Sequence, residues 1–241
     1  MRNHELNNNN FYIAISGNIA SGKTTLTKAL SKELNIKMYE EPVLENPFLE
    51  PYYKYLDLHN KDPGNKEILQ KAQKWGYALQ EFFLLNRVID HKKIMMFNEP
   101  IIQDRSIYED KEIFARNSYD LNLISEEDFQ KYLLLYNILA SNLKAPDILI
   151  YLETSVPTLK SRVKKRIEEE PTRENEKELA EEKDYYLKNL NHRYKLWINN
   201  YDKGPKLIMN TDEKNFEENP RHLEVLVEEM KRITNISAIL K

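Results

Sequence analysis

One stretch near the N-terminus constrains this chain more than any other. Residues 17–24 read GNIASGKT, which has the glycine and lysine spacing of a phosphate-binding loop. Residues 11–16 (FYIAIS) precede it and are typical of a buried strand, and the leucines after it recur every four residues, as in a helix. The loop therefore stands between a strand and a helix, which is the context it needs. The sequence predicts a binding site for a nucleoside triphosphate.

The residue types in this loop suit phosphate and Mg²⁺. Backbone N–H groups and the N-terminus of the following helix can surround phosphate oxygens. The Lys23 ammonium can reach the transferred phosphate, and the Thr24 hydroxyl can bind Mg²⁺. The predicted nucleotide-binding set is Gly17, Asn18, Ala20, Ser21, Gly22, Lys23, Thr24 and Thr25.

Length and composition exclude several classes of protein. The 241 residues suit one α/β domain over residues 11–241, after a disordered lead-in at residues 1–10. A net charge of −3 gives no reason to expect nucleic acid as a partner. No apolar run approaches the ~20 residues that cross a bilayer, so we expect no membrane partner. The absence of cysteine excludes disulfides and zinc–cysteine sites, and we expect a cytoplasmic location.

Four more short strand-like runs alternate with helical patterns along the rest of the chain. The runs cover residues 36–39, 100–103, 147–152 and 206–209, and the helical patterns include 66–95, 107–117, 125–140, 183–200 and 220–233. Strands that alternate with helices form a parallel sheet with helices on both faces. The predicted fold is α/β with a five-stranded parallel sheet.

Two of the predicted strands end in charged residues. Glu41 follows the second strand, and a carboxylate at that end of a parallel strand points into the crevice where ligands bind. A solvated surface acid is equally compatible with that position. Asp104 and Arg105 follow the third strand, which suggests a Mg²⁺-associated acid and an anion-binding arginine.

Polar residues recur on one face of the long helical pattern at residues 66–95. Gln80, Phe83 and Arg87 lie three or four residues apart, so they share that face. They could read the edge of a nucleobase, although the residues alone favour an exposed polar face. Asp110 and Phe114 share a face of a later helical pattern in the same way.

A basic cluster at residues 162–166 (RVKKR) lies just before an acidic run and a proline at residues 168–171. In a phosphate-binding protein, such a cluster suits a mobile lid, here about residues 162–182, that closes over the triphosphate. A solvated end of a charged helix is about as compatible with this composition.

Taken together, these motifs resemble the deoxynucleoside kinase family, and bacterial purine-type members look most similar. The matching segments are GNIASGKTT, EEPV, LQEFFLLNR, DRSIYEDKEIFA, the RVKKR lid and YLKNLNHRYKLW. The resemblance implies a P-loop NTPase fold with a nucleoside-monophosphate-kinase-like topology, usually as a homodimer. It also implies an enzyme that uses ATP and Mg²⁺ to phosphorylate the 5′-hydroxyl of a purine deoxynucleoside. Deoxyadenosine is favoured, and deoxyguanosine or deoxycytidine is possible.

The resemblance implies roles for the catalytic residues. Glu41 falls at the general base for the 5′-hydroxyl, and Asp104 falls at the acid that holds Mg²⁺ through water, next to Thr24. Arg105 falls at the residue that positions the 5′-oxygen and the base. The implied catalytic set is Glu41, Lys23, Arg105 and the lid residue Arg166.

The resemblance also implies how the nucleoside is held. Gln80 falls at the residue that pairs with the base, and Phe114 falls at the one that stacks on it. Arg87 and Asp110 match a pair typical of members that accept purines or cytosine. The implied substrate-binding set is Ile19, Glu41, Tyr53, Gln80, Phe83, Arg87, Arg105, Asp110, Phe114 and Glu170.

The chain departs from the family pattern at two of these positions. The tyrosine that binds the 3′-hydroxyl usually lies shortly before the tryptophan matching Trp75, where this chain has Leu69, so Tyr53 is the candidate. The lid normally carries a second arginine and then a glutamate, and here Arg166 and Glu170 are the candidates.

Two other functions were weighed against this one. A nucleoside monophosphate kinase of the thymidylate kinase type shares the loop, but its phosphate acceptor needs cations where this chain has Glu41. A non-catalytic nucleotide-binding switch lacks support, because no D-x-x-G and no N-K-x-D occurs in the sequence.

Overall fold

The structure is a computed structural model that describes residues 11–39, 46–170, 185–214, 216, 219–234 and 236–239. Three predictions lie outside these residues: the disordered lead-in, the position of Glu41, and the part of the lid after residue 170. They stay predictions.

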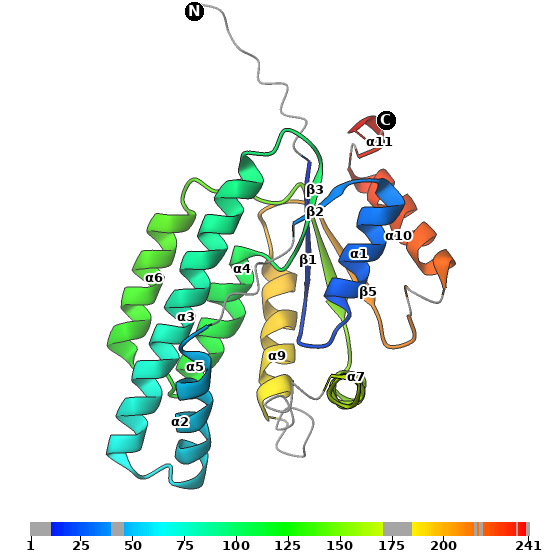
Figure 1. Ribbon diagram of the computed structural model, residues 1–241. Coiled ribbons are helices and arrows are strands. Elements are labelled where there is room, and N and C mark those ends of the chain that lie inside the picture. Colours follow the sequence, from blue (N-terminus) through cyan, green and yellow to red (C-terminus); the bar gives the residue numbers. More distant parts are fainter. Residues whose placement is uncertain are drawn as a thin grey trace, which may run out of the picture.

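Five strands form one parallel sheet at the centre of the molecule (Figure 1). The sheet has the order β2-β3-β1-β4-β5, and every described pair of neighbouring strands is parallel. The five-stranded parallel sheet is therefore confirmed, and each strand begins and ends within one residue of its predicted position. The strands are β1 (Tyr12–Gly17), β2 (Lys37–Tyr39), β3 (Ile101–Asp104), β4 (Ile148–Glu153) and β5 (Lys206–Asn210).

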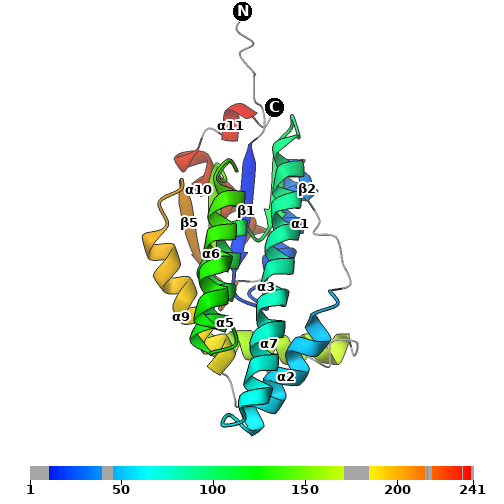
Figure 2. The same ribbon diagram turned by 90° about the vertical axis from the view of Figure 1, so that its left-hand side faces the viewer.

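Helices cover both faces of the sheet, and further helices form a layer on one side (Figures 1 and 2). None of the described helices is long and apolar enough to cross a membrane. The helices are α1 (Lys23–Leu34), α2 (Leu49–Lys61), α3 (Lys66–Met95), α4 (Ile107–Glu109), the π-helix η1 (Asp110–Ala115), α5 (Arg116–Asp120), α6 (Glu126–Ala140), α7 (Val156–Glu169), α9 (Tyr185–Asn200), α10 (Pro220–Ile233) and α11 (Ile236–Ile239).

The strand order places the phosphate-binding loop at a switch point. β1 lies between β3 and β4, so the chain leaves β1 toward one edge of the sheet and later returns to fill the other. In parallel sheets, ligands bind at such a point, beyond the carboxyl ends of the strands. Ile15 of β1 is in register with Asp104 of β3, so the loop and the acid after β3 meet at the same edge.

Alternate residues of β1 point to opposite faces of the sheet, and both faces are buried. Ile13 and Ile15 belong to a core that includes residues of α1 and α10. Tyr12 and Ala14 belong to a second core that includes residues of α9. This double burial explains why β1 reads as a continuous apolar run.

Helix α2 was missed by the sequence analysis, which noted only aromatic residues and a closing turn at residues 46–65. Its side chains pack on α3, and Tyr52 is buried there. Its N-cap residue, Phe48, makes no side-chain cap, and the start signal lies two residues earlier, where Asn46 Oδ1 accepts the Phe48 N–H at 3.0 Å. By contrast, α6 has a side-chain cap, with the Ser125 hydroxyl accepting the Asp128 N–H at 3.1 Å.

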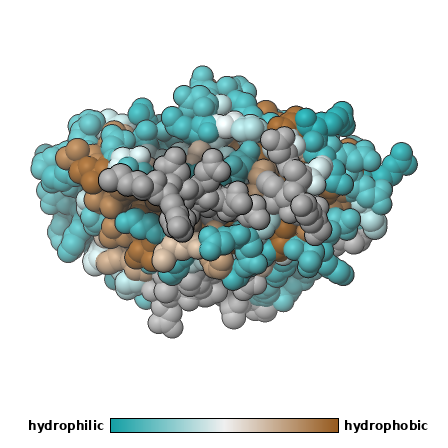
Figure 3. Space-filling view, turned by 90° about the horizontal axis from the view of Figure 1, so that it is seen from above, coloured by the Kyte–Doolittle hydropathy of each residue, from teal (hydrophilic) through white to brown (hydrophobic). Residues whose placement is uncertain are grey.

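The expectation of an exposed polar face on α3 is wrong. Gln80 and Arg87 are each only 4% exposed, whereas Leu85 and Ile89 of the same helix are 41% and 51% exposed. The polar face turns inward because α3 packs against η1, whose Asp110 supplies an opposite charge. In Figure 3, apolar patches interrupt a mostly hydrophilic surface, some of them on the side where α3 and α6 lie.

One glycine sets how closely α3 approaches the segment after α5. A Cβ atom at Gly76 would lie 2.0 Å from the Leu123 carbonyl oxygen, far inside van der Waals contact. A helix-interior glycine costs about 1 kcal/mol of helix propensity relative to alanine. Because Gly76 has no side chain, the backbone of α3 can pack closely against the backbone at Leu123.

We therefore expect Gly76→Ala to lower the free energy of unfolding by about 1–3 kcal/mol, because the clash outweighs the gain in propensity. Gly64→Ala is the matched control, since a Cβ there meets no atom within 4 Å. Urea unfolding of both variants measures the difference. Equal stability of the two variants would contradict this account of Gly76.

Candidate active site

The phosphate-binding loop turns tightly between β1 and α1. Gly22, which precedes α1, has φ +96°, and Ala20 has φ +61°. A Cβ atom at Gly17 would lie 2.5 Å from the Ser21 hydroxyl oxygen. The glycine at position 17 is therefore required by close packing inside the loop, and the one at position 22 by its backbone conformation.

Lys23 is the buried cation of the loop. Its side chain is 7% exposed, and its Nζ donates to the Asn18 carbonyl oxygen at 2.8 Å. Burial and, to a smaller extent, the nearby Arg105 cation lower the pKa of Lys23 to about 7, against the opposing effect of Asp104. The ammonium is thus held where an additional anion would be strongly favourable.

Thr24 and Asp104 meet as the strand register requires. The Thr24 hydroxyl donates to Asp104 Oδ2 at 2.6 Å. The other oxygen, Asp104 Oδ1, is buried and has no hydrogen-bond partner within the described part of the chain. Mg²⁺ in nucleotide sites typically takes one or two protein oxygens together with phosphate and water oxygens. No cluster of three or more metal-ligating side chains exists among the described residues, and this pair fits that simpler requirement.

Arg105 is held at the end of β3 by both its backbone and its side chain. Its φ is +67°, and its N–H donates to the Ile15 carbonyl oxygen at 2.8 Å. The centre of its guanidinium lies 4.8 Å from the centroid of the Phe114 ring. Its Nη1 donates to the Tyr194 hydroxyl at 3.1 Å and lies 3.5 Å from Glu109 Oε1.

Glu109 and Tyr194 were missed by the sequence analysis. Glu109 is fully buried, and its Oε2 accepts the Ser106 N–H at 2.8 Å as part of a helix-capping box. The serine–glutamate spacing at residues 106 and 109 is a readable signal for that cap. Nothing in the sequence indicated that Tyr194, far along the chain, would contact the same carboxylate.

Two further elements hold the phosphate-binding loop. Asn18 donates to Asn191 Oδ1 of α9 at 2.7 Å, and Asn191 donates to the Thr154 carbonyl oxygen at 2.8 Å. From α7, Arg162 donates to the Ser21 carbonyl oxygen at 3.0 Å and also to the Thr211 carbonyl oxygen. Arg162, the first arginine of the predicted lid, therefore binds the phosphate-binding loop directly.

The predicted base-binding residues come together between α3 and η1. Arg87 Nε lies 3.4 Å from Asp110 Oδ2, and both side chains are only 4% exposed. Gln80 Nε2 donates to the Ser118 hydroxyl at 3.3 Å. Its buried Oε1 has no hydrogen-bond partner among the described residues, so this oxygen can accept from a ligand.

The remaining predicted residues lie around the phosphate-binding loop and the predicted base-binding residues. Ile19 and Phe114 are partly buried in the core of the sheet face that α9 covers, and Phe83 packs in the cluster of α2 and α3. Tyr53 is 36% exposed on α2. Arg166 lies near enough to Lys23 to lower its pKa.

The position of Glu170 does not test its predicted role. It lies exposed at the end of α7, directly before the undescribed residues 171–184. Its contact with a sugar stays a prediction.

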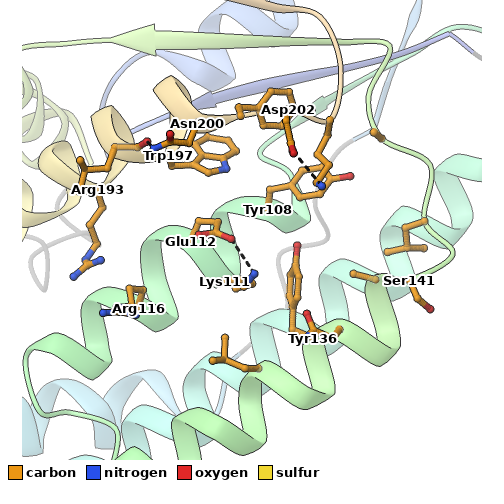
Figure 4. A pocket seen from close by; sticks show the side chains of 18 of the residues that line it. Tyr108, Lys111, Glu112, Arg116, Tyr136, Ser141, Arg193, Trp197, Asn200 and Asp202 are labelled. Atoms are coloured by element: carbon orange, nitrogen blue, oxygen red, sulfur yellow. Dashed lines mark hydrogen bonds and ion pairs between the residues drawn. The ribbon is translucent and has the colours of Figure 1, made fainter.

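A further cavity lies away from these residues. About 920 Å³ in volume, it is lined by residues of α6, α9 and the helical stretch from Tyr108 to Arg116 (Figure 4). Figure 4 shows charged and aromatic side chains there, with Lys111 and Glu112 paired. None of the predicted site residues lines this cavity.

The fold and the loop define a P-loop nucleotide-binding protein. Comparison with known proteins narrows that class, because the model of the deoxynucleoside kinase family matches residues 13–235. The chain belongs to the deoxynucleoside kinase family and is a phosphotransferase.

Individual relatives differ in the bases their names give. The chain is 29% identical over 232 residues to the deoxyadenosine/deoxycytidine kinase of Bacillus subtilis, which covers 95% of each chain. It is 32% identical over 222 residues to a deoxyguanosine kinase of Lactobacillus acidophilus, which covers 90% of this chain and 88% of the relative.

A solved structure agrees with these relatives. The deoxyadenosine kinase of M. mycoides with bound dCTP matches with a TM-score of 0.69 and 29% identity, over 92% of this chain and all of the other.

The lowered pKa of Lys23 predicts that ATP binding is coupled to proton uptake. At pH 8 most Lys23 side chains are neutral in the free protein, since the pKa is about 7. Phosphate anions favour the ammonium, so binding of ATP with Mg²⁺ should take up about one proton at that pH. Calorimetry in buffers of different ionisation enthalpy measures this uptake.

Lys23→Met should abolish this proton uptake, whereas Lys28→Met, which changes an exposed lysine of the same helix, should not. Equal uptake by the wild type and Lys23→Met would show that another group titrates.

Proposed function

We propose that the chain transfers the terminal phosphoryl group of ATP to the 5′-hydroxyl of a purine deoxynucleoside. Deoxyadenosine is the favoured substrate, with deoxyguanosine and deoxycytidine as possible alternatives. One observation carries this proposal: the buried polar set of Gln80, Arg87 and Asp110 is linked to the phosphate-binding loop through Phe114 and Arg105. A set of buried polar side chains beside a phosphate site suits a nucleoside acceptor.

The residues divide the work of phosphoryl transfer, which depends chiefly on positioning and on charge stabilisation. Lys23 and Arg166 would neutralise charge on the phosphates, and Thr24 with Asp104 would hold Mg²⁺. When bound, Mg²⁺ would further neutralise the phosphate oxygens. Arg105 would orient the 5′-oxygen, and Glu41 would accept its proton.

The polar set favours bases with both an amino group and a ring acceptor. A carboxylate such as Asp110 only accepts hydrogen bonds, and a guanidinium such as Arg87 only donates them. Adenine, cytosine and guanine satisfy both kinds of group, whereas thymine presents a carbonyl where the amino group would be. Leaving a buried polar group unsatisfied costs about 1–3 kcal/mol, so the pocket should discriminate. Phe83 should also limit room for the thymine methyl group.

An ATP-consumption assay against the four deoxynucleosides and their 5′-monophosphates tests the proposed substrate. We expect turnover with deoxyadenosine and little with thymidine. Turnover with monophosphates alone would instead support the monophosphate kinase alternative, and turnover with no acceptor would support a nucleotide-binding switch.

Replacing the ion pair should relax the choice of base. In Arg87→Met with Asp110→Leu, the thymine carbonyl no longer faces the Asp110 carboxylate, so the preference for deoxyadenosine should narrow at least ~tenfold, mostly by a gain with thymidine. The control replaces the exposed pair of the same helix, Glu67→Gln with Lys71→Gln. Ratios of kcat/KM measure the effect, and an unchanged ratio in the first variant would remove these residues from base recognition.

Glu41→Gln tests the general base. The amide keeps the shape and the hydrogen bonding of the carboxyl group but cannot accept the proton, so kcat should fall by about 10²-fold or more. Nucleoside binding should change little. Glu40→Gln is the neighbouring control, and more than half of the activity remaining in Glu41→Gln would transfer the role to another residue.

We also propose that the chain forms a homodimer and works in the cytoplasm. Leu134 and Ile138 of α6 and Leu196 of α9 are each more than half exposed, at 63%, 64% and 51%, and such apolar surface suits contact with a second copy. Light scattering measures the mass in solution, and the mass of a single chain would contradict the dimer.

A further inference from the structure

The backbone of Arg105 alone does not fix the orientation of its guanidinium. Its side chain is 19% exposed, and its guanidinium ends a flexible stem next to the phosphate-binding loop. A misplacement of about 1 Å in a positioning group can cost ~10²-fold in rate. The groups that restrain this guanidinium therefore matter to the reaction.

The two carboxylate oxygens of Glu109 have different partners. Oε2 accepts the Ser106 N–H at 2.8 Å and lies 3.4 Å from the Ser106 hydroxyl oxygen, which caps the helix. Oε1 accepts the Tyr194 hydroxyl at 2.8 Å and lies 3.5 Å from Arg105 Nη1. Helix capping thus uses one oxygen and leaves the other for the site.

The Tyr194 hydroxyl completes this arrangement. Its single proton goes to Glu109, so its oxygen is left to accept from Arg105 Nη1 at 3.1 Å. The ring is fully buried, stacked on Tyr151 with centroids 5.7 Å apart and edge-on to Trp197. Burial and the Glu109 charge raise the pKa of Tyr194, which keeps the hydroxyl protonated and able to donate.

We propose that Glu109 and Tyr194 are positioning residues. They hold the Arg105 guanidinium in place for phosphoryl transfer to the 5′-oxygen. The inference rests on the proposed function of this site. The alternative is that the two residues only join α4 to α9. Charge favours the first role, because the buried Glu109 carboxylate lies 3.5 Å from the guanidinium of Arg105.

Tyr194→Phe removes one hydroxyl and leaves the helix cap intact. We expect kcat for the preferred deoxynucleoside to fall ~tenfold, with the KM for ATP within about twofold of wild type. Tyr201→Phe is the matched control: it makes the same change at a buried tyrosine just after α9, whose hydroxyl has no partner among the described residues. That control should keep wild-type kcat.

A double-mutant cycle separates positioning from support of the fold. If Tyr194 acts through Arg105, Tyr194→Phe should change kcat less than about twofold in an Arg105→Ala background. Where turnover in that background is too slow to measure, the dissociation constant of the deoxynucleoside serves as the readout. A full ~tenfold loss in both backgrounds, or a lower melting temperature with unchanged kcat, would overturn the proposal.

Glu109→Gln provides a second, independent readout. The amide keeps a capping oxygen and removes the charge, so kcat should fall as in Tyr194→Phe. This loss should shrink to less than about twofold in an Arg105→Ala background, and a wild-type kcat in Glu109→Gln would contradict a role for Glu109. If the wild type and Tyr201→Phe phosphorylate no deoxynucleoside, the proposed function fails, whereas active enzymes without coupling to Arg105 overturn only this inference.

Discussion

Burying the Lys23 ammonium at the carboxyl end of β1 is the constraint on which the rest of the site depends. A buried cation is costly unless polar groups surround it. Here the loop carbonyl of Asn18 accepts from Lys23, and neighbouring elements hold the loop in place. Asn191 of α9 and Arg162 of α7 bind the loop directly, and Asp104 of β3 binds the next residue, Thr24. Segments far apart in sequence thus converge on one short turn.

The second organising feature is the buried polar face of α3. This helix buries Gln80 and Arg87 next to its apolar stripe, whereas Leu85 and Ile89 of the same helix are exposed. The partner of this polar face is η1, a π-helical turn that carries both Asp110 and Phe114. π-Helical turns are rare and often mark functional sites. The buried polar set of Gln80, Arg87 and Asp110 therefore forms where α3 packs against a π-helical turn.

Sequence patterns predicted the sheet and the phosphate-binding loop well, because both rest on local signals. Double burial makes each central strand a short apolar run, and the loop needs glycine, lysine and threonine at fixed spacing. The polar face of α3 could not be predicted from local pattern, since its burial depends on η1. Residues alone favoured exposure there, and only the resemblance to a family indicated a pocket.

The contacts of Tyr194 and Arg162 were unpredictable for a related reason. Each reaches a partner far away in the chain, across an interface whose geometry the sequence does not encode locally. Glu109 could have been recognised as a helix cap from its spacing to Ser106, but its second oxygen gains a role only through α9. The N-cap residue of α2, Phe48, makes no side-chain cap.

The central claim is that the loop after β1 and the buried polar residues of α3 and η1 are two halves of one site, which joins phosphate to a sugar hydroxyl. Proton-coupled phosphorus NMR of the product formed from ATP, Mg²⁺ and deoxyadenosine tests it most directly. The account predicts a phosphate ester split by the two 5′ protons, formed by the wild type and not by Lys23→Met. An ester at the 3′ position, or equal product from Lys23→Met, would contradict it.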